Sequence, residues 1–491
     1  MATDETAGTV PAAAAGPKGR SVRFWVLAIG AVTFLAGLLF GYDQGVISGA
    51  LKLVKQDLDI GTFASEIITS WVTLGALAGA LVAGVLADRI GRRKVLVAAG
   101  VLFILGAVVE AVADSAAVLT VGRVITGIGV GFASTIAPLY AAEMAPQKWR
   151  GRMVSSYQLA ITFGIFVAYL VDDALTESGA WRTMFLLAVV PGALLMIGVF
   201  LVPESARWLA KMGRKTEARD ALAHVTPPDK VDAELAAVEA QIATEAEGGE
   251  ASWREVFSPR MRKALVVGVG LSIFQQITGI NAIIYYANEI FDRAGLTSTN
   301  QQTTATLYCV GLVNVLATFI AVAYVDRFGR RPLLFAGLVG MFVSLTAVGI
   351  GFATTGTTDT GAGASLAGIV TMVALVVFIA SFAFSLGPVV WTIISEIFPS
   401  RVRGRAVSLA TAVNWGAAFL VTQFFLTVVN EIGEAATFFV LALMCVFAYI
   451  FVWRYVPETR GRSLEEIQEQ WARDEPASEW EDTAPVFHAH D

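Results

Sequence analysis

Hydrophobic residues occur along this chain in long runs that are separated by short polar stretches. Each run is long enough to cross a bilayer as a helix, which takes about 20 residues at a rise of about 1.5 Å per residue. The runs cover 24–51, 66–87, 94–113, 117–142, 153–173 and 182–202, then 263–291, 301–325, 332–352, 366–395, 406–429 and 435–455. This pattern predicts an all-α membrane protein with about twelve transmembrane helices in two sets of six.

Composition agrees with this prediction. Hydrophobic residues make up 56% of the 491 residues and charged residues 15%, whereas soluble domains carry about 25% charged residues. Cys309 and Cys445 lie far apart inside apolar runs, which is typical of small buried side chains and not of a disulfide or metal site. The motifs HExxH, GxxxxGK(S/T) and GxSxG do not occur, so the usual signatures of a zinc protease, an ATP-driven pump and a serine hydrolase are missing. We expect no enzyme activity, no metal and no nucleic-acid partner.

The polar stretches divide the chain into five parts. Residues 1–23 are rich in Ala, Gly and Thr and predict a disordered tail, and the last part of the chain predicts an acidic tail. The largest polar insert alternates Ala with Glu and Arg, as short amphipathic helices do, and is too thinly apolar for a catalytic domain. The predicted parts are a tail at 1–23, a bundle at 24–202, a helical linker at 203–261, a bundle at 262–455 and a tail at 456–491.

Positive charges collect in the loops that follow the even-numbered runs. These loops carry Arg89, Arg92, Arg93 and Lys94; Lys148, Arg150 and Arg152; Arg327, Arg330 and Arg331; and Arg401, Arg403 and Arg405. The loops after the odd-numbered runs are acidic or neutral, apart from the first, in which the charges are mixed. Because positively charged loops stay on the cytoplasmic side, both termini are predicted to be cytoplasmic. We therefore expect a multi-pass protein of the plasma (cytoplasmic) membrane.

The second half of the chain repeats charged motifs of the first half. LADRIGRRK at 86–94 returns as YVDRFGRRP at 324–332, and EMAPQKWRGR at 143–152 returns as EIFPSRVRGR at 396–405. A shorter pair is VPESARWL and VPETRGR, each of which follows the last run of its set. Matches of this length, in the same order, indicate that the two sets of six are related copies, as in two-bundle transporters.

The repeated motifs place acidic and basic residues together on the predicted cytoplasmic side. Carboxylates there can meet arginines or the positive N-terminal end of a helix. We hypothesise that these charges form a salt-bridge latch between the two halves, which breaks when the carrier opens inward. The alternative is that they only set the topology. The proposed latch residues are Asp88, Arg92, Glu143, Arg150, Arg152, Asp326, Arg330, Glu396, Arg403 and Arg405.

The first run contains one residue that is charged at neutral pH, Asp43. A lone carboxylate in an apolar helix is costly unless it is protonated or paired. Arg123, in the fourth run, lies about 9 Å below the predicted outer end of its helix, against about 12 Å for Asp43. An ion pair is the least costly arrangement for two charges at this depth, and such a pair suits proton coupling, since burial favours the neutral acid and the cation favours the carboxylate. The alternatives are that the first helix ends at Asp43 and that Arg123 reaches the membrane interface.

Uncharged amides and Trp side chains are prominent in the runs of the second half. Amides suit the hydroxyl groups of a neutral polyol, and aromatic faces pack on the C–H faces of sugar rings. Thr278 and Gly279 predict a break in the seventh helix, which is tolerated where a helix lines a cavity. For each amide the alternative is a hydrogen bond between helices. The candidate sugar contacts are Gln158, Gln275, Gln276, Asn281, Asn314, Trp391, Asn414 and Trp415.

Several motifs along the chain, from residue 24 to about residue 470, also carry a family resemblance. They are FGYDQGVISGA, LADRIGRRK, GRVITGIGVG, EMAPQKWRGR, VPESARWL, QQITGINAIIYY, DRFGRRP, GPVVWTIISEIFP and VPETRGRSLEEI. In combination they resemble the sugar porter family of the major facilitator superfamily. The resemblance implies the major facilitator fold of two pseudo-symmetric six-helix bundles, alternating access, and a central site for a neutral sugar or polyol.

The resemblance also implies roles for single residues. The candidate sugar contacts named above match the family's sugar-binding positions. Phe40, Tyr285 and Tyr286 match aromatic residues near the site or its outer gate. Asp43 matches the aspartate of the family's proton symporters, where facilitative glucose carriers have Asn, and Arg123 matches its arginine partner.

We therefore predict a proton-coupled symporter that imports a monosaccharide or cyclic polyol, such as a hexose, a pentose or myo-inositol, by alternating access. The proton is the coupling ion, no other cofactor is expected, and the carrier is expected to function as a monomer in the lipid bilayer. The main alternative is a facilitative transporter of the same fold, in which Asp43 has only a structural role. A non-transporting sugar sensor would need a signalling segment, and a drug or cation exporter would favour a more apolar or acidic cavity.

Overall fold

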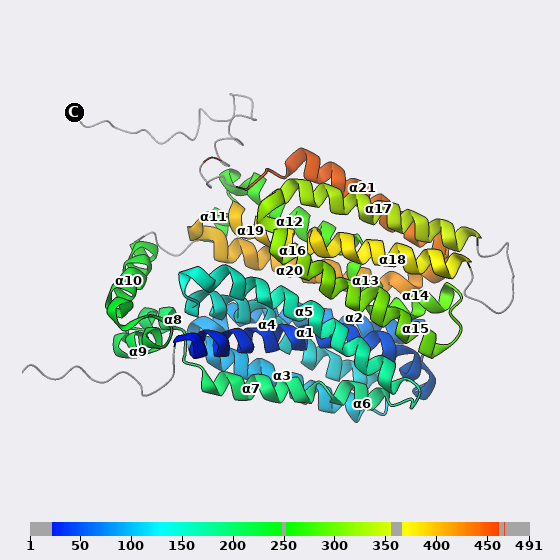
Figure 1. Ribbon diagram of the computed structural model, residues 1–491, viewed down its shortest axis with the longest axis horizontal. Helices are drawn as coiled ribbons and strands as arrows, with labels where there is room; N and C mark the ends of the chain where they lie inside the picture. The colour runs from blue at the N-terminus through cyan, green and yellow to red at the C-terminus, as the bar shows by residue number, and fades with distance from the viewer. Residues whose placement is uncertain (1–21, 248–251, 355–365, 461–465, 467–491) are drawn as a thin grey trace, which may run out of the picture.

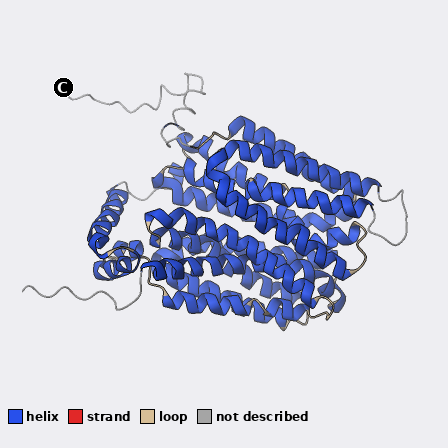
Figure 2. Ribbon diagram, in the orientation of Figure 1, coloured by secondary structure: helices blue, strands red, loops and turns tan. Residues whose placement is uncertain are grey.

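The computed structural model describes residues 22–247, 252–354, 366–460 and 466 (Figure 1). Over these residues the chain is helical, with short turns and loops and no strand (Figure 2). Twelve helical segments are long and apolar enough to cross a membrane. The prediction of an all-α membrane protein with about twelve spans is confirmed.

The first six spans form one bundle. Its helices are α1 (Val22–Asp57), α2 (Thr62–Ile90), α3 (Arg92–Ala111), α4 (Ala116–Met144), α5 (Gln147–Leu175), α6 (Trp181–Leu186) and α7 (Val189–Leu201), of which the last two form the sixth span. In the core of this bundle α1 packs along α5, and α4 packs along both α2 and α3. The first helix continues past the predicted end at residue 51, because its polar last turns find partners: Lys52 and Lys55 pair with carboxylates of the second bundle.

The last six spans form a second bundle. Its helices are α12 (Arg262–Ile277), α13 (Ile280–Tyr285), α14 (Ala287–Arg293), α15 (Thr299–Ala305), α16 (Val313–Phe328), α17 (Arg330–Thr354), α18 (Leu366–Phe384), α19 (Leu386–Ile397), α20 (Ser400–Ile432) and α21 (Glu434–Tyr455). A π-helical stretch, Thr306–Leu312, joins α15 to α16. In this bundle α17 packs along α18 and α21, and α12 packs along α20. The two bundles lie side by side (Figure 1), and α2 and α20 contact each other across the boundary between them.

The short helices that connect the two bundles along the sequence lie at one end of the molecule, together with the start of α1 (Figure 1). They are α8 (Ala206–Lys211), α9 (Lys215–Val225), α10 (Val231–Glu247) and α11 (Trp253–Val256), with single 3-10 turns at Pro228–Lys230 and Pro259–Met261. Below, this end is called the linker end and the opposite one the far end. The predicted tails, 1–23 and 456–491, fall almost wholly outside the described residues.

The seventh span is interrupted where the sequence predicts a break. Helix α12 stops at Ile277, Gly279 has a φ of 96°, and the chain continues as α13. Glycine populates this left-handed region without the clash that a Cβ would cause. A Cβ at this position would also lie 2.9 Å from Leu441 Cδ1. The break places two glutamines of α12 and an asparagine of α13 within hydrogen-bonding distance of one another.

Candidate functional site

The structure brings Asp43 and Arg123 together in the first bundle. Asp43 Oδ1 lies 2.6 Å from Arg123 Nη1, and the two side chains are 5% and 0% exposed. Arg123 Nε donates to the Ile68 carbonyl at 3.3 Å, and its guanidinium faces the Phe185 ring. Because α1 continues well past Asp43 and Arg123 is fully buried, neither a helix end at Asp43 nor an interfacial Arg123 describes the structure. In a low-dielectric interior each charge depends on the other for its stability.

A second carboxylate, which the sequence analysis missed, lies beside this pair. Glu110, in the last turn of α3, is buried, and its Oε1 lies 3.8 Å from Arg123 Nη1. The Thr126 hydroxyl donates to the same oxygen at 2.9 Å. The signal in the sequence was a lone glutamate near the end of the third apolar run. The site therefore contains two carboxyl groups and one guanidinium.

Five buried amides form a hydrogen-bonded chain between the two bundles. Asn281 accepts from Gln44 of α1 at 3.3 Å and donates to Gln276 at 2.8 Å. Gln276 donates to Asn414 at 3.1 Å, and Asn414 donates to Gln275 at 2.7 Å. Four of these amides are predicted sugar contacts, and Gln44, next to Asp43, is one that the sequence analysis missed. Since each amide donates or accepts, this chain, called the amide network below, offers polar partners that a polyol can use.

The other predicted sugar contacts lie on neighbouring helices. Trp415 of α20 is buried, and its ring lies 5.5 Å from the ring of Phe40 of α1, centroid to centroid. Asn314 on α16 is buried, and Gln158 on α5 and Trp391 on α19 are half-buried. Among the described residues, no hydrogen bond joins these three to the amide network.

The two predicted gate tyrosines are buried and hydrogen-bonded. The Tyr285 hydroxyl accepts from Gln44 at 3.4 Å, and the Tyr286 hydroxyl donates to the Thr422 carbonyl of α20 at 3.0 Å. Tyr286 also stacks on Phe425 with a ring separation of 5.3 Å. Both tyrosines line a small crevice together with charged residues of α1 and α14. They therefore lie between the amide network and the charged contacts of the far end.

Polar contacts join the two bundles at the far end. Lys52 of α1 pairs with Asp292 at 3.1 Å, and the next turn pairs Lys55 with Glu289 at 3.3 Å. A second contact joins α2 to α20. The buried Glu66 of α2 accepts a hydrogen bond from the Thr427 hydroxyl of α20 at 2.7 Å and another from the Thr427 backbone N–H. The molecule is therefore closed between its bundles at the far end.

At the linker end, charges of the first bundle converge on the start of α3. Glu143 accepts from Arg92 Nε and Nη2, both at 3.0 Å, and Arg92 Nη1 donates to Asp88 at 3.0 Å. Glu204 accepts the backbone N–H groups of Arg92 at 3.0 Å and Arg93 at 3.1 Å. A carboxylate in this position satisfies N–H groups that a helix start leaves free and stabilises the positive end of the helix.

The second bundle repeats this arrangement at the start of α17. Glu396 accepts from Arg330 Nη2 at 3.1 Å. Glu458 accepts the backbone N–H groups of Arg330 and Arg331, both at 3.0 Å. Glu458 thus corresponds to Glu204, and both belong to the repeated VPE motifs, although neither is among the predicted latch residues. The repeat in the sequence corresponds to a repeated capping site in the structure.

The remaining predicted latch residues are only partly described. Arg403 Nε donates to the Phe398 carbonyl at 3.0 Å, and the Arg405 guanidinium lies 5.9 Å from the ring centroid of Trp253 in the linker. The side chains of Arg150, Arg152 and Asp326 lie outside the described part of the chain. At the linker end, each predicted latch pair with both partners described joins helices of one bundle. A latch between the bundles stays a prediction.

Replacing Glu458 with Ala is expected to destabilise the protein by about 1 kcal/mol, since α17 loses the cap at its first turn. The expected result is a lower midpoint of thermal unfolding in detergent at neutral pH. Glu431→Ala, which removes an exposed carboxylate, is the matched control. Equal midpoints for Glu458→Ala and the wild type would contradict the capping role.

This stabilisation should depend on pH. Burial alone would raise the pKa of Glu458, but the backbone N–H groups of Arg460, Arg330 and Arg331 outweigh it and hold the pKa below its usual range. A group with a lowered folded-state pKa stabilises fully above its unfolded pKa, which is about 4.3 for Glu. The stability difference between wild type and Glu458→Ala should therefore be full at neutral pH and shrink as the pH falls below that value.

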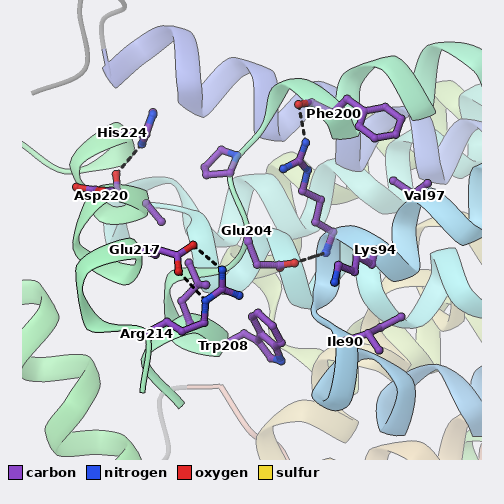
Figure 3. A pocket seen from close by; sticks show the side chains of 14 residues that line it. Ile90, Lys94, Val97, Phe200, Glu204, Trp208, Arg214, Glu217, Asp220 and His224 are labelled. Carbon is purple, nitrogen blue, oxygen red and sulfur yellow. Dashed lines mark hydrogen bonds and ion pairs between the residues drawn. The ribbon is translucent and has the colours of Figure 1, made fainter. Parts of the chain in front are cut away.

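A pocket at the linker end contains none of the predicted site residues (Figure 3). It lies between α3, the end of α7, and the linker helices α8 and α9. Two of its cations are bound within it: Arg214 pairs with Glu217 at 2.5 Å, and Arg93 donates to the Phe200 carbonyl at 2.7 Å. The pocket is lined by equal numbers of positive and negative side chains, so neither charge is in excess. They are the cations Arg93, Lys94 and Arg214 and the carboxylates Glu204, Glu217 and Asp220. We regard it as the junction between the linker and the first bundle.

Comparisons with known proteins identify the family. The family model described as "Sugar (and other) transporter" matches residues 29–471. The galactose-proton symporter of Escherichia coli (strain K12) is 40% identical over 454 residues, which cover 92% of this chain and 95% of that protein. The glucose transporter GlcP of Staphylococcus epidermidis is 38% identical over 448 residues, which cover 91% and 96%. Both relatives span nearly the whole chain.

Solved structures agree with this result. The xylose transporter XylE from E. coli in its inward open conformation matches with a TM-score of 0.77 and 30% identity, covering 91% of this chain and 100% of that chain. A second structure of XylE matches with a TM-score of 0.75 and 31% identity, and the match covers 91% of this chain and 99% of that chain. It is described as the major facilitator superfamily proton:xylose symporter bound to 6-bromo-6-deoxy-D-glucose. The predicted two-bundle fold is thereby confirmed, and so is the prediction of a transporter in place of an enzyme. The chain is a multi-pass membrane protein with the major facilitator fold and belongs to the sugar (and other) transporter family.

Proposed function

We propose that this protein is a proton-coupled symporter that carries a monosaccharide or cyclic polyol into the cell. The observation that carries the proposal is the position of two neighbouring residues on α1. Asp43 holds the buried Arg123, and Gln44, the next residue, is hydrogen-bonded to Asn281 of the amide network. A protonatable carboxyl group and a sugar-binding amide thus share one turn of one helix, so a change at either is transmitted to the other.

The relatives support both parts of the proposal. Besides the galactose-proton symporter, an arabinose-proton symporter of Bacillus subtilis (strain 168) is 35% identical over 457 residues. XylE is described as a proton:xylose symporter and was solved with a halogenated deoxyglucose. These substrates are neutral sugars, and the amide network is likewise uncharged.

The amide network is the proposed centre of the sugar site. In the structure its donors and acceptors bind one another, and a sugar hydroxyl, which both donates and accepts, is able to replace such a partner. Trp415 and Phe40 supply flat faces nearby, and such faces pack on the C–H faces of a sugar ring. We place Gln158, Asn314 and Trp391 in the same site.

The proposed cycle alternates between closure at the far end and closure at the linker end. Protonation of Asp43 from outside releases Arg123, sugar binds between the bundles, and the far end closes through contacts such as Lys52 with Asp292. The linker end then opens, with rearrangement of the proposed latch, and sugar and proton leave. A ligand shifts such an equilibrium only through its different affinities for the two states, so sugar and proton must each favour the form that closes at the far end.

We place the carrier in the plasma membrane as a monomer, with the linker end and both termini in the cytoplasm. The support is the concentration of basic residues in the loops of the linker end, which follows the positive-inside rule. The proton is the only coupling ion in this proposal.

The proposal is tested with purified protein in liposomes that contain a pH-sensitive dye. At zero membrane potential the vesicles are challenged with D-galactose, D-glucose, D-xylose, L-arabinose and myo-inositol. Acidification of the interior with one of these compounds, and not with empty vesicles, is the expected result, and it also identifies the substrate.

A facilitative transporter is the second candidate function. The observation that favours it is that Asp43 and Arg123 form a fully buried, short ion pair, which is also what a purely structural pair would show. In that case one compound would show counterflow with no proton movement. Absence of counterflow with every compound would contradict both functions.

A further inference from the structure

Glu110 is a buried carboxylate that the proposed cycle does not use. It is 2% exposed, and its side chain reaches from α3 toward α4. Its Oε1 accepts from the Thr126 hydroxyl at 2.9 Å and lies 3.8 Å from Arg123 Nη1, within ion-pair distance. Arg123 is therefore shared between two carboxylates, with Asp43 the nearer at 2.6 Å.

The helices come unusually close at this site. A Cβ at Gly122 of α4 would lie 2.6 Å from Glu110 Cγ, and a Cβ at Gly106 of α3 would overlap the Thr126 hydroxyl. Only glycine at these two positions leaves room for the carboxyl group and the hydroxyl that binds it. The packing of α3 on α4 thus holds Glu110 against Arg123.

Other ionisable groups on the helices around this site have partners elsewhere. The Tyr42 hydroxyl of α1 donates to the Met184 carbonyl at 2.6 Å, and Arg182 of α6 pairs with Asp57 at 2.7 Å. Glu66 of α2 is bound to α20, and the sequence of α7 contains no ionisable residue. The charged groups that act on Glu110 are thus Arg123 on α4 and Asp43 on α1, and the Tyr42 hydroxyl of α1 is a further titratable group near it.

We propose that Glu110 is the alternate counterion of Arg123, which takes over the guanidinium when Asp43 is protonated and so sets the proton concentration at which coupling occurs. This inference rests on the proposed proton symport. The step adds one proton to the Asp43 carboxylate and breaks its ion pair, while Arg123 stays protonated and Glu110 stays ionised. Arg123 Nη2 is buried without a hydrogen-bond partner among the described residues, so it is available to donate to Glu110.

The count of charges explains why a second carboxylate matters. With Glu110 ionised, the cluster of Asp43, Glu110 and Arg123 has one net negative charge before protonation and none after it. Without Glu110, protonation of Asp43 would leave an unpaired buried guanidinium, which is strongly unfavourable. Glu110 therefore makes the proton-loaded state the neutral one, and the carrier loads protons at lower proton concentration than a lone Asp43–Arg123 pair would.

The test compares the wild type with Glu110→Gln in liposomes, using D-galactose or whichever compound of the panel above gives the largest counterflow. The measured quantity is the external pH at which uphill uptake is half-maximal. Loss of one charge at this distance should raise the required proton concentration about tenfold or more. Counterflow at acidic pH should persist, because Gln still accepts from Thr126. An unchanged half-maximal pH would overturn the proposal, since a permanently neutral Glu110 is well mimicked by Gln.

Two further variants sharpen this comparison. Asp114→Asn removes one exposed negative charge from the loop that follows α3 and should leave the half-maximal pH unchanged. Thr126→Val removes the hydroxyl donor without changing any charge and should shift the half-maximal pH in the same direction as Glu110→Gln, by less. If Glu110→Gln does not fold, Thr126→Val tests the proposal in its place, and an unchanged half-maximal pH of uphill uptake in Thr126→Val would overturn the proposal.

Infrared spectroscopy separates a failure of this inference from a failure of the proposed function. The comparison uses Asp43→Asn and the double variant Asp43→Asn/Glu110→Gln, so that Asp43 contributes to neither spectrum, and their difference spectrum should contain the band of an ionised carboxylate throughout the pH range of transport. The band of a protonated carboxylic acid in its place would overturn the inference, whether or not uptake is coupled to protons. If the wild type moves sugar without protons, the proposed function fails, and the same spectrum still decides the charge of Glu110.

Discussion

Asp43→Asn should abolish uphill sugar uptake while sugar counterflow persists. The amide keeps the shape of the carboxyl group and resembles its protonated form, so the bundles remain able to alternate. It binds no proton, however, and Arg123 no longer has its nearest anion. With one proton per sugar, each unit of pH gradient supports about tenfold accumulation in the wild type. In Asp43→Asn the internal and external sugar concentrations should become equal at any gradient.

Both quantities are measured on the same liposomes with radiolabelled substrate, with and without an imposed pH gradient. The matched control is Asp57→Asn, which neutralises a partly exposed carboxylate on the same helix, where it pairs with Arg182. This control should still accumulate sugar. Accumulation by Asp43→Asn would refute the coupling role, and loss of counterflow would mean that the carboxylate is needed for the fold or for alternation itself.

Gln276→Ala should weaken sugar binding by about ten- to a hundredfold, which corresponds to the roughly 1–3 kcal/mol lost when buried polar groups lose a partner. Gln276 is at the centre of the amide network, where it accepts from Asn281 and donates to Asn414. Its removal takes away one proposed sugar partner and leaves both neighbours poorly oriented. Asn414→Ala should have an effect of similar size, because Asn414 holds Gln275 and Gln276 together.

The measurement is the dissociation constant by calorimetry in detergent, supported by the KM of counterflow. Asn288→Ala is the matched control, since Asn288 is a buried amide of α14 whose side chain is bonded to Thr306, outside the network. Its dissociation constant should change little. Unchanged binding in both Gln276→Ala and Asn414→Ala would show that the amides only join helices, which was the alternative for each of them.

The spans and their approximate limits could be predicted because they depend on local properties. A bilayer core of about 30 Å requires about 20 apolar residues per helix, and each run of this length proved to be helical. The break at Gly279 was also a local signal, since glycine adopts a left-handed conformation readily. The ends of the helices were less well predicted. Helix α1 continues to Asp57 because Lys52 and Lys55 find carboxylates on α14, a contact that its own sequence does not contain.

The charged motifs at the linker end show the same limit. Their repetition in the sequence predicted two related halves, and the structure has corresponding clusters around Glu143 and Glu396. The sequence did not indicate that Glu204 and Glu458 cap the starts of α3 and α17, because each lies far along the chain from the helix that it caps.

The sequence by itself determined the class of the protein and the number of spans, and it predicted that Asp43 and Arg123 lie at a similar depth, because depth follows from a constant rise per residue along a helix. Only the tertiary structure decided which side chains meet at that depth, because the direction in which a helix faces depends on how its neighbours pack. Glu110 reaches Arg123 because two glycines let α3 approach α4 closely, and Gln44 reaches Asn281 because α1 packs against α13 of the other bundle.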